Sequence, residues 1–311
     1  MHAADPPHVA ILLSVYDGDR FIDEQLESIA AQRGVRWTLT WRDDGSDPTR
    51  SCDVRLEAFR ARFPAQVFAS GSPQGRMGVG ASFMALLARA PDADYVAFAD
   101  QDDVWLPDKL SRAVGRLAEV GGAALYCGRQ NLVDATLAPI GLSQVPRRPL
   151  GFSNALVQNV ATGCTMVLNR AAHDAIRAMP APEGALHDWW AYLVVAGIGG
   201  HLIYDAEPFI LYRQHERNAV GSTGGTVARA IRAMRRGPGP FLESLDRHLR
   251  QLLAYRDRLT PENRRTLDAL RAARVAPLLR RPGAVMGTGV YRQGTGEDLV
   301  LRAWLMLRSA R

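Results

Sequence analysis

The chain has 311 residues, and its 47% hydrophobic and 23% charged content excludes a disordered chain and leaves room for one large domain with an appendage. The net charge of +6 is uneven, because residues 226–311 hold 18 Arg against 7 Asp or Glu, whereas residues 1–225 are net acidic. The three cysteines are odd in number and widely spaced, which excludes a disulfide framework and a zinc pattern and predicts a cytoplasmic protein. We expect neither a secretion signal, because Met1–His8 lacks a basic segment followed by a long apolar run, nor a membrane-spanning helix, because the sequence has no long uncharged apolar window.

The N-terminal part of the chain predicts strands that alternate with helices. Short, continuous apolar runs indicate buried strands, and apolar residues at helical spacing indicate helices. This alternation predicts an α/β fold with a doubly wound, parallel sheet, in which ligands bind beyond the carboxyl ends of the strands. The expected strands are Val9–Val15, Trp37–Trp41, Gln66–Ala69 and Tyr95–Ala99, and the expected helices are Phe21–Ile29, capped by Asp19, then Leu56–Phe63 and Ala81–Ala90.

Acidic residues follow three of these strands. Tyr16–Asp19 follows the first strand, Asp43–Asp44 the second and Asp100–Asp103 the fourth. Carboxylates at this density repel one another, so folding should tolerate them only beside a cation or beside hydrogen-bond donors that replace one. Carboxylate oxygens are hard ligands that favour Mg²⁺ or Mn²⁺. The alternative is a set of solvated turns in which Asp103 or Asp108 caps a helix, but convergence on one sheet edge favours the metal site.

The second half of the chain predicts further strands and helix starts that carry polar residues. A glycine-rich loop, Gly221–Gly225, is either a lid over bound substrate or a plain linker. The chain after this loop is expected to be helical and basic. The expected strands are Ala124–Cys127, Thr165–Leu168 and Pro208–Tyr212, the last of which leads to Arg213 and His215, and His187–Trp190 precedes a helix.

Several motifs resemble those of family 2 glycosyltransferases of the GT-A fold. The segments Leu12–Leu26, Arg42–Ser46 and Phe98–Leu110 carry this resemblance. The later segments Thr162–Met166, His187–Trp190 and Leu211–His215, with Asn218, resemble the bacterial rhamnosyltransferase-like branch, which builds cell-surface polysaccharides. The resemblance implies a mixed, mostly parallel sheet flanked by helices. It also implies a catalytic domain over residues 1–225, with a nucleotide-binding part over 1–120 and an acceptor-binding part over 121–225, followed by a basic helical extension over 226–311.

The resemblance implies a site for a nucleotide-diphosphate sugar and a divalent metal, Mg²⁺ or Mn²⁺. Asp43 would bind the base, although a plain turn residue is the alternative, and Asp44 would shape the turn. Asp102 would ligate the metal, which acts as a Lewis acid on the leaving diphosphate. Asp100 and His215 would be the further ligands. The other residues expected to contact the donor are Ser14, Val15, Tyr16, Arg76, Gln101 and Arg213, with Arg213 as a bidentate phosphate donor.

For the acceptor side, the resemblance makes Asp188 the general base of an inverting transfer. Its carboxylate would take the proton of the acceptor hydroxyl as that oxygen attacks the anomeric carbon. The alternative is a helix-capping Asp beside core tryptophans, and capping and catalysis are compatible. The residues expected to contact the acceptor are Asp103, Thr162, Trp189 and Trp190.

The predicted function is therefore an inverting, metal-dependent glycosyltransferase that extends a cell-surface glycan. L-rhamnose from dTDP-L-rhamnose is the first expectation, and a UDP-hexose or UDP-N-acetylhexosamine donor is the alternative. A sugar-phosphate nucleotidylyltransferase is disfavoured, because the first turn, Tyr16–Asp19, is acidic where a triphosphate needs basic residues. A nucleic-acid-binding protein is disfavoured too, because aromatic residues do not interleave with the arginines. The basic extension is expected to bind an anionic membrane surface, where a lipid-linked acceptor lies, or else to pack on the catalytic domain or another subunit.

Overall fold

The computed structural model describes residues 5–70, 75–215 and 237–307. In this part of the chain, a seven-stranded sheet has the order β10-β6-β9-β4-β1-β2-β3, in which β9 runs antiparallel to β4 and β6 and the other pairs are parallel. The expected mixed, mostly parallel sheet is thus confirmed. Its strands are β1 His8–Val15, β2 Arg36–Asp43, β3 Val67–Ala69, β4 Tyr95–Ala99, β6 Ala124–Gly128, β9 Val167–Asn169 and β10 His201–Asp205.

Helices cover both faces of this sheet. Along β1, Ile11 and Leu13 point into one apolar cluster, and Ala10 and Leu12 point into the other. Both sets are fully buried, which explains why the strand reads as a continuous apolar run. The first face packs against α1 Ile22–Ala30, α2 Asp53–Arg62 and α4 Lys109–Ala118, and the second against α3 Val79–Ala88, α5 Phe152–Ala155, α6 Arg170–Arg177 and α7 His187–Gly197.

One predicted cap is wrong. Asp19 does not cap α1, because the N-cap position is Phe21 and no side chain bonds the first turn there. Arg50 instead donates to the Asp19 carboxylate at 3.4 Å, and to Asp17 at 3.0 Å. Asp19 therefore stabilises the loop after β1 and not the start of the helix.

A second, four-stranded sheet has the order β5-β11-β7-β8 and joins distant parts of the chain. The short strand β5 begins directly after the acidic run Asp100–Asp103 and pairs antiparallel with β11, so that Val104 lies opposite Leu211. Since β11 leads to His215, this pairing brings His215 to the acidic run. The strands are β5 Val104–Trp105, β7 Asn131–Val133, β8 Pro139–Leu142 and β11 Ile210–Arg213.

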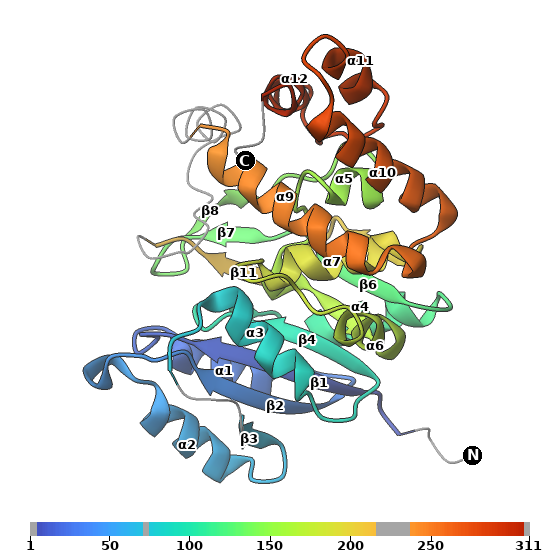
Figure 1. Ribbon diagram of the computed structural model, residues 1–311. Helices are drawn as coiled ribbons and strands as arrows, with labels where there is room; N and C mark the ends of the chain where they lie inside the picture. Colours follow the sequence, from blue (N-terminus) through green and yellow to red (C-terminus); the bar gives the residue numbers. More distant parts are fainter. Residues whose placement is uncertain (1–4, 71–74, 216–236, 308–311) are drawn as a thin grey trace.

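The described C-terminal helices pack on the rest of the chain. Leu245 and Leu252 are fully buried in the same apolar cluster as Trp190 and Leu193 of α7. Asn263 donates to the carbonyls of Ala196 and Gly197, both at 2.9 Å, and so joins α10 to the end of α7. Figure 1 shows these helices, in orange and red, at the end of the molecule opposite α2 and β3. They are α9 Gly239–Ala254, α10 Pro261–Val275, α11 Arg281–Met286 and α12 Thr295–Leu305.

Of the alternatives for the extension, packing on the catalytic part therefore holds for its described helices. The predicted lid, Gly221–Gly225, and the predicted boundary after residue 225 lie outside the described residues. No helix in the described ranges has the length and apolar character to cross a bilayer.

Candidate active site

The predicted acidic turns meet at one edge of the large sheet. In register, Val15 lies opposite Asp43 on β2, and Leu13 lies opposite Ala99 on β4, so the three strands end side by side. Beyond these ends opens a cleft of about 2200 Å³. The predicted site residues that line it are Ser14, Tyr16, Arg76, Asp100, Gln101, Asp102, Thr162, Asp188, Trp189 and His215.

Asp102 and His215 form a pair inside this cleft. The His215 Nε2 atom lies 2.7 Å from the Asp102 Oδ2 atom, and both side chains are largely buried. The imidazole also packs on the Phe21 ring, with 5.2 Å between ring centres. These contacts join residues that lie 113 positions apart in the sequence, which the β5–β11 pairing makes possible.

Asp100 lies beside this pair in a strongly negative environment. Burial, together with the negative charges of Asp102 and Asp188, raises the pKa of its carboxyl to about 7. Both of these neighbours line the same cleft. A cation bound at this position would relieve the repulsion and return Asp100 to its charged form.

The residues at this edge fit a hard divalent ion. Asp102 offers a carboxylate oxygen and His215 an imidazole nitrogen at one point of the cleft, and Asp100 adds a second carboxylate nearby. Oxygen with one nitrogen is a donor set that Mg²⁺ or Mn²⁺ accepts. Asp102, His215 and Asp100 are thus the residues that would hold the ion.

A different trio of potential ligands lies behind this edge. Ligand atoms of Asp100, Asp103 and Cys164 all lie within 4.8 Å of one another. Burial raises the pKa of the Cys164 thiol and of the Asp103 carboxyl well above their usual values. A protonated thiol is a poor ligand, and a thiolate is too soft for Mg²⁺ or Mn²⁺. The trio of Asp100, Asp103 and Cys164 therefore does not fit the predicted ion.

Asp103 was predicted to contact the acceptor, and the structure contradicts this. Its side chain is 0% exposed, and one carboxylate oxygen accepts a hydrogen bond from the Arg213 backbone amide at 3.2 Å. The reason is the β5–β11 pairing, which covers Asp103 with the second sheet. Lys109 is buried nearby, packs on the Trp105 ring, and has its pKa lowered to about 7 by burial.

Arg213 was predicted to bind the diphosphate and is instead a buried brace. Its side chain is 1% exposed, and its guanidinium donates to the carbonyls of Asp102 (2.8 Å) and Ala135 (2.7 Å) and to the Glu24 carboxylate (2.5 Å). It also lies 4.3 Å from the centre of the Phe21 ring. Arg213 therefore holds the backbone of Asp102 in place from behind the cleft.

The two aspartates at the end of β2 differ from the prediction, because both carboxylates bind neighbouring parts of the chain. Asp43 shapes the turn, because its Oδ1 accepts from the amides of Gly45 (2.8 Å) and Ser46 (2.7 Å). Asp44 lines the cleft, whereas Asp43 is absent from its described lining. The Asp44 carboxylate accepts from Arg42 at 2.7 Å and from the amides of Met77 (2.7 Å) and Gly78 (2.8 Å). Asp44 thus ties the loop before α3 to the sheet edge.

Two further residues that were predicted to contact a ligand do not belong to the described lining of the cleft. The backbone around Val15 was expected to run along the nucleoside, but the whole residue is 0% exposed, whereas its neighbours Ser14 and Tyr16 line the cleft. Trp190 is 0% exposed, and its indole N–H donates to the Met179 carbonyl at 2.7 Å. Trp189 is the tryptophan of this pair that faces the cleft, and its N–H donates to the Ala155 carbonyl at 2.7 Å.

Asp188 lies in the first turn of α7, on the wall of the cleft. Its Oδ2 accepts from the Gly163 amide at 3.1 Å and its Oδ1 from the Trp189 amide at 2.7 Å. Gly163 must be glycine for this approach, because a Cβ there would lie 2.6 Å from the His187 Nε2 atom. These two hydrogen bonds hold the carboxylate in one orientation.

The loop after β1 is held by Gln101. The Gln101 side chain accepts from the Tyr16 amide at 2.8 Å and donates to the Tyr16 carbonyl at 2.9 Å. Arg76 lies 4.5 Å from the centre of the Tyr16 ring, and Ser14 bonds Ser82 at 2.6 Å. Gln101 thus lines the cleft and also holds the Tyr16 backbone in position.

Residues of the C-terminal extension also line the cleft, and the sequence analysis missed them. The segment Leu299–Leu307 is apolar around most of its circumference, so the sequence analysis did not separate its faces. Glu297, Val300 and Trp304 are three and four residues apart and therefore share one helix face, and this spacing could have identified the face that lines the cleft. The lining residues from the extension are Arg292, Gln293, Gly294, Glu297, Val300 and Trp304.

Comparisons with known proteins agree with the geometry. Residues 10–177 match the model of the family described as Glycosyl transferase family 2. The dTDP-rhamnosyl transferase RfbG of Shigella flexneri is 28% identical over 228 residues, which cover 68% of this chain and 74% of that protein. A second relative is the Escherichia coli protein WfgD, a UDP-Glc:alpha-D-GlcNAc-diphosphoundecaprenol beta-1,3-glucosyltransferase, which is 26% identical over 52% of this chain and 60% of its own length.

A solved structure shows the same fold. S. aureus TarS 1-349 in complex with UDP-GlcNAc superposes with a TM-score of 0.59 at 13% identity, and the match covers 90% of this chain and 79% of TarS 1-349. TarS is a GT-A glycosyltransferase. The predicted GT-A architecture is thus confirmed.

Proposed function

This chain belongs to glycosyl transferase family 2, and we propose from its cleft that it is an inverting, metal-dependent enzyme. The sugar would come from a nucleotide-diphosphate donor, with L-rhamnose on dTDP as the first candidate. It would be added to a glycan or lipid-linked acceptor in the synthesis of a cell-surface polysaccharide. The observation that carries the proposal is that Asp102, His215 and Asp188 line one cleft, with Asp102 and His215 paired at 2.7 Å.

Each residue has a chemical task in this proposal. A divalent ion held by Asp102, His215 and Asp100 would supply Lewis-acid stabilisation to the departing diphosphate. Tyr16, positioned by Gln101, and Arg76 would line the nucleoside and phosphate side. Asp188 would accept the proton of the attacking hydroxyl, a task that its fixed orientation supports.

Rhamnose is proposed first because of the relative RfbG, whose name records dTDP-rhamnosyl transfer. The name of WfgD records transfer from UDP-Glc and motivates a UDP-hexose as the alternative. A panel of donors tests both the rhamnose and the UDP-hexose candidates. The protein is mixed with Mn²⁺, octyl glycosides and one donor at a time, and the released nucleoside diphosphate is measured. The donors are dTDP-L-rhamnose, UDP-glucose, UDP-GlcNAc and GDP-mannose. We expect release from dTDP-L-rhamnose above that from the other donors. If no donor releases its nucleoside diphosphate faster than in a protein-free control, the proposed function is wrong.

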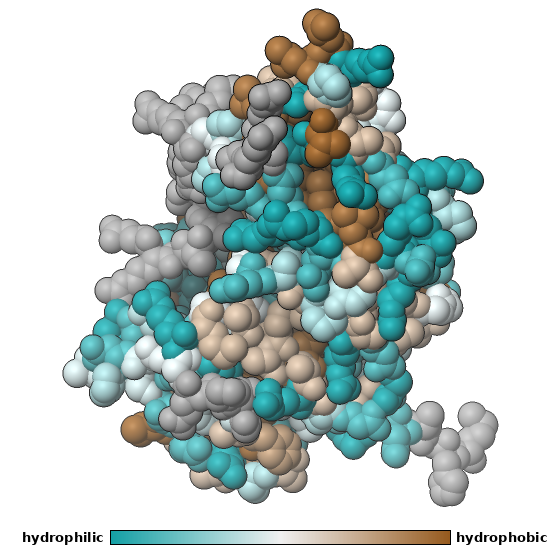
Figure 2. All heavy atoms as spheres, in the orientation of Figure 1, coloured by the Kyte–Doolittle hydropathy of each residue, from teal (hydrophilic) through white to brown (hydrophobic). Residues whose placement is uncertain are grey.

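We also propose that the extension places the enzyme on an anionic membrane surface. Figure 2 shows brown, apolar side chains at the end of the molecule where α11 lies in Figure 1. The last residue of α10 and the segment that leads to α11 expose apolar side chains, with Val275 at 76%, Leu278 at 70% and Leu279 at 96%. Arg271 and Arg280 are exposed beside them. Apolar side chains with arginines around them suit the boundary between lipid headgroups and acyl chains.

Sedimentation with vesicles tests this membrane proposal. We expect the protein to sediment with vesicles that contain phosphatidylglycerol. A variant with Leu278→Glu and Leu279→Glu should remain in the supernatant, because two exposed leucines that would enter the lipid boundary become charged groups. A control with Val54→Glu changes an exposed valine on α2, far from this end (Figure 1). Equal sedimentation of all three proteins would refute the proposal.

A further inference from the structure

The cleft is larger than a nucleotide sugar needs. Its volume of about 2200 Å³ exceeds the roughly 300–1,000 Å³ of most small-molecule pockets by a factor of about two or more. The predicted donor residues lie at the sheet edge, whereas the remaining space extends past Asp188 and Trp189 toward the C-terminal helices. This outer part has room for a second ligand beside the donor.

One face of α12 forms the outer wall of this space. Glu297, Val300 and Trp304 project from this face into the cleft, and each is partly exposed. The neighbouring face of the same helix carries Leu301 and Leu305, which are buried in the core. The helix is therefore fixed by its core side, so that its cleft side keeps one position.

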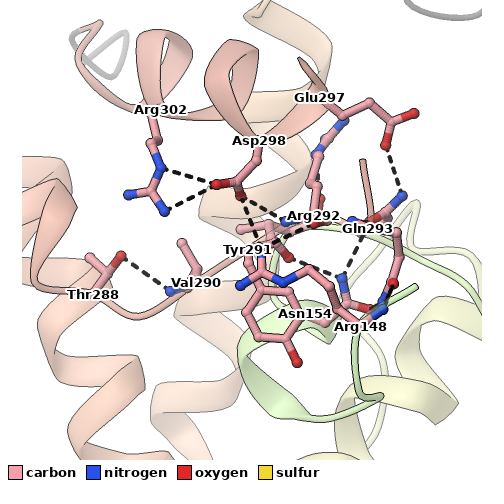
Figure 3. Close-up of polar contacts among 12 residues, drawn as sticks. Arg148, Asn154, Thr288, Val290, Tyr291, Arg292, Gln293, Glu297, Asp298 and Arg302 are labelled. Carbon is pink, nitrogen blue, oxygen red and sulfur yellow. Dashed lines mark hydrogen bonds and ion pairs between the residues drawn. The ribbon is translucent and has the colours of Figure 1, made fainter. Parts of the chain in front are cut away.

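The wall is tied to the catalytic part by hydrogen bonds between uncharged amides and one carboxylate. The Gln158 side chain donates to Glu297 at 3.1 Å and accepts from the Gln293 amide at 2.8 Å. The Gln293 side chain in turn donates to Asn154 at 3.3 Å and accepts from the amides of Arg147 (2.9 Å) and Arg148 (2.7 Å). Figure 3 shows Asn154, Gln293 and Glu297 within this one network.

Arginine side chains make the wall rigid. The Arg292 guanidinium donates to the Val157 carbonyl at 3.1 Å and packs on the Phe241 ring, which also contacts Trp304 with 5.6 Å between ring centres. Burial lowers the pKa of the Arg292 guanidinium. Arg148 lies 3.8 Å from the centre of the Tyr291 ring (Figure 3). A wall held this firmly is preorganised for a ligand.

The chemistry of the wall matches a neutral sugar. Side-chain amides donate hydrogen bonds to hydroxyls and accept from them, and a carboxylate accepts from them. A partly exposed indole offers a flat apolar surface to the C–H face of a pyranose ring. We infer that Gln158, Gln293, Glu297 and Trp304 form a subsite for an uncharged hexose unit of the acceptor. This inference rests on the proposed function, since it takes the deeper part of the cleft to be the donor site.

Binding of simple glycosides tests the inference without requiring turnover. A panel of octyl α- and β-glycosides of glucose, galactose, mannose, rhamnose and N-acetylglucosamine is mixed with the protein, dTDP and Mn²⁺, and saturation-transfer NMR is recorded. We expect at least one member to receive saturation on its pyranose C–H protons. Trp304→Ala should weaken its binding by about tenfold, which is the size of effect expected when one aromatic contact is lost.

A second variant and a control make the test independent of folding defects. Val300→Trp keeps Trp304 and its packing on Phe241 but fills the subsite, so it should also abolish glycoside binding. Leu299→Ala changes an exposed residue on another face of α12 and should bind like the unchanged protein. Circular dichroism melting verifies that each variant is folded.

The inference is overturned if no glycoside of the panel binds, or if Trp304→Ala and Val300→Trp bind as well as the Leu299→Ala control. Failure of the proposed function is recognised separately, by hydrolysis of the donor. In the absence of any glycoside, the unchanged protein should slowly release nucleoside diphosphate from its donor to water. If the unchanged protein released no nucleoside diphosphate, the proposed function would be refuted, independently of the result of the glycoside-binding test.

Discussion

Replacing Asp188 with Asn should abolish sugar transfer and leave donor binding intact. The amide keeps an oxygen that can accept from Gly163 or Trp189, but it cannot take the proton of the attacking hydroxyl. General base catalysis contributes about 10² to 10⁴ in rate, so we expect kcat to fall by about that factor. The measurement is the initial rate of nucleoside diphosphate release with a saturating glycoside, together with the donor affinity by calorimetry.

Asp108→Asn is the matched control for this variant. Asp108 lies at the N-cap position of α4, where no side-chain cap bond forms, and it does not belong to the described lining of the cleft. The control should therefore transfer sugar at the unchanged rate. If Asp188→Asn kept its rate within a few-fold, Asp188 would not be the base. If it lost donor binding instead, the carboxylate would act on the donor.

Replacing Asp102 with Asn should have the second large effect, on donor binding that depends on the metal. The change removes the negative charge at Oδ2, the atom that lies 2.7 Å from His215 and that would hold the ion. We expect nucleoside diphosphate to bind about 100-fold more weakly in the presence of Mn²⁺, which corresponds to about 2.7 kcal/mol. Calorimetric titrations with dTDP and UDP, with Mn²⁺ and with EDTA, measure this difference.

Asp92→Asn serves as the control, because the Asp92 side chain is 85% exposed and lies away from the cleft in a surface ion pair with Arg170. It should bind nucleoside diphosphate as the unchanged protein does. An Asp102→Asn protein with the same Mn²⁺-dependent affinity as this control would show that Asp102 does not ligate an ion. A loss of affinity that is equally large in EDTA would assign Asp102 to the nucleotide itself.

The sequence predicted the sheet edge well because the signals there are local. A buried parallel strand reads as a continuous apolar run, and its carboxyl end points to the ligand. Asp100, Asp102 and Tyr16 follow such runs directly, so their place in the cleft was predictable. His215 and Asp188 were placed by family resemblance, and the structure brings both into the same cleft.

The errors arose where burial depends on pairing between distant segments. Nothing in the run Asp100–Asp103 shows that β11 will cover Asp103, or that Arg213 will turn inward to brace the Asp102 carbonyl. Likewise, adjacent aspartates such as Asp43 and Asp44 point to opposite sides of a strand end. Tertiary packing decides which of the two carboxylates accepts a hydrogen bond from the Met77 amide, and here it is Asp44.

The extension was the least predictable part, because a single helix with apolar residues suits several environments. The pattern in α9 equally fits a membrane surface, a second subunit or the protein core, and the structure buries Leu245 and Leu252 in the core. With α9 packed there, α12 faces the cleft, which gives the extension a place in the active site. Several arginines of its described helices form internal contacts, such as the Arg274 pair with Asp246 at 3.1 Å.

A crystal structure with Mn²⁺ and a nucleoside diphosphate, with the ion located by its anomalous scattering, tests the central claim most directly. The account predicts one strong anomalous peak between the Asp102 carboxylate, the His215 imidazole and the diphosphate oxygens. A nucleotide bound in the cleft with no peak beside Asp102, or with manganese ligated by other residues, would contradict it.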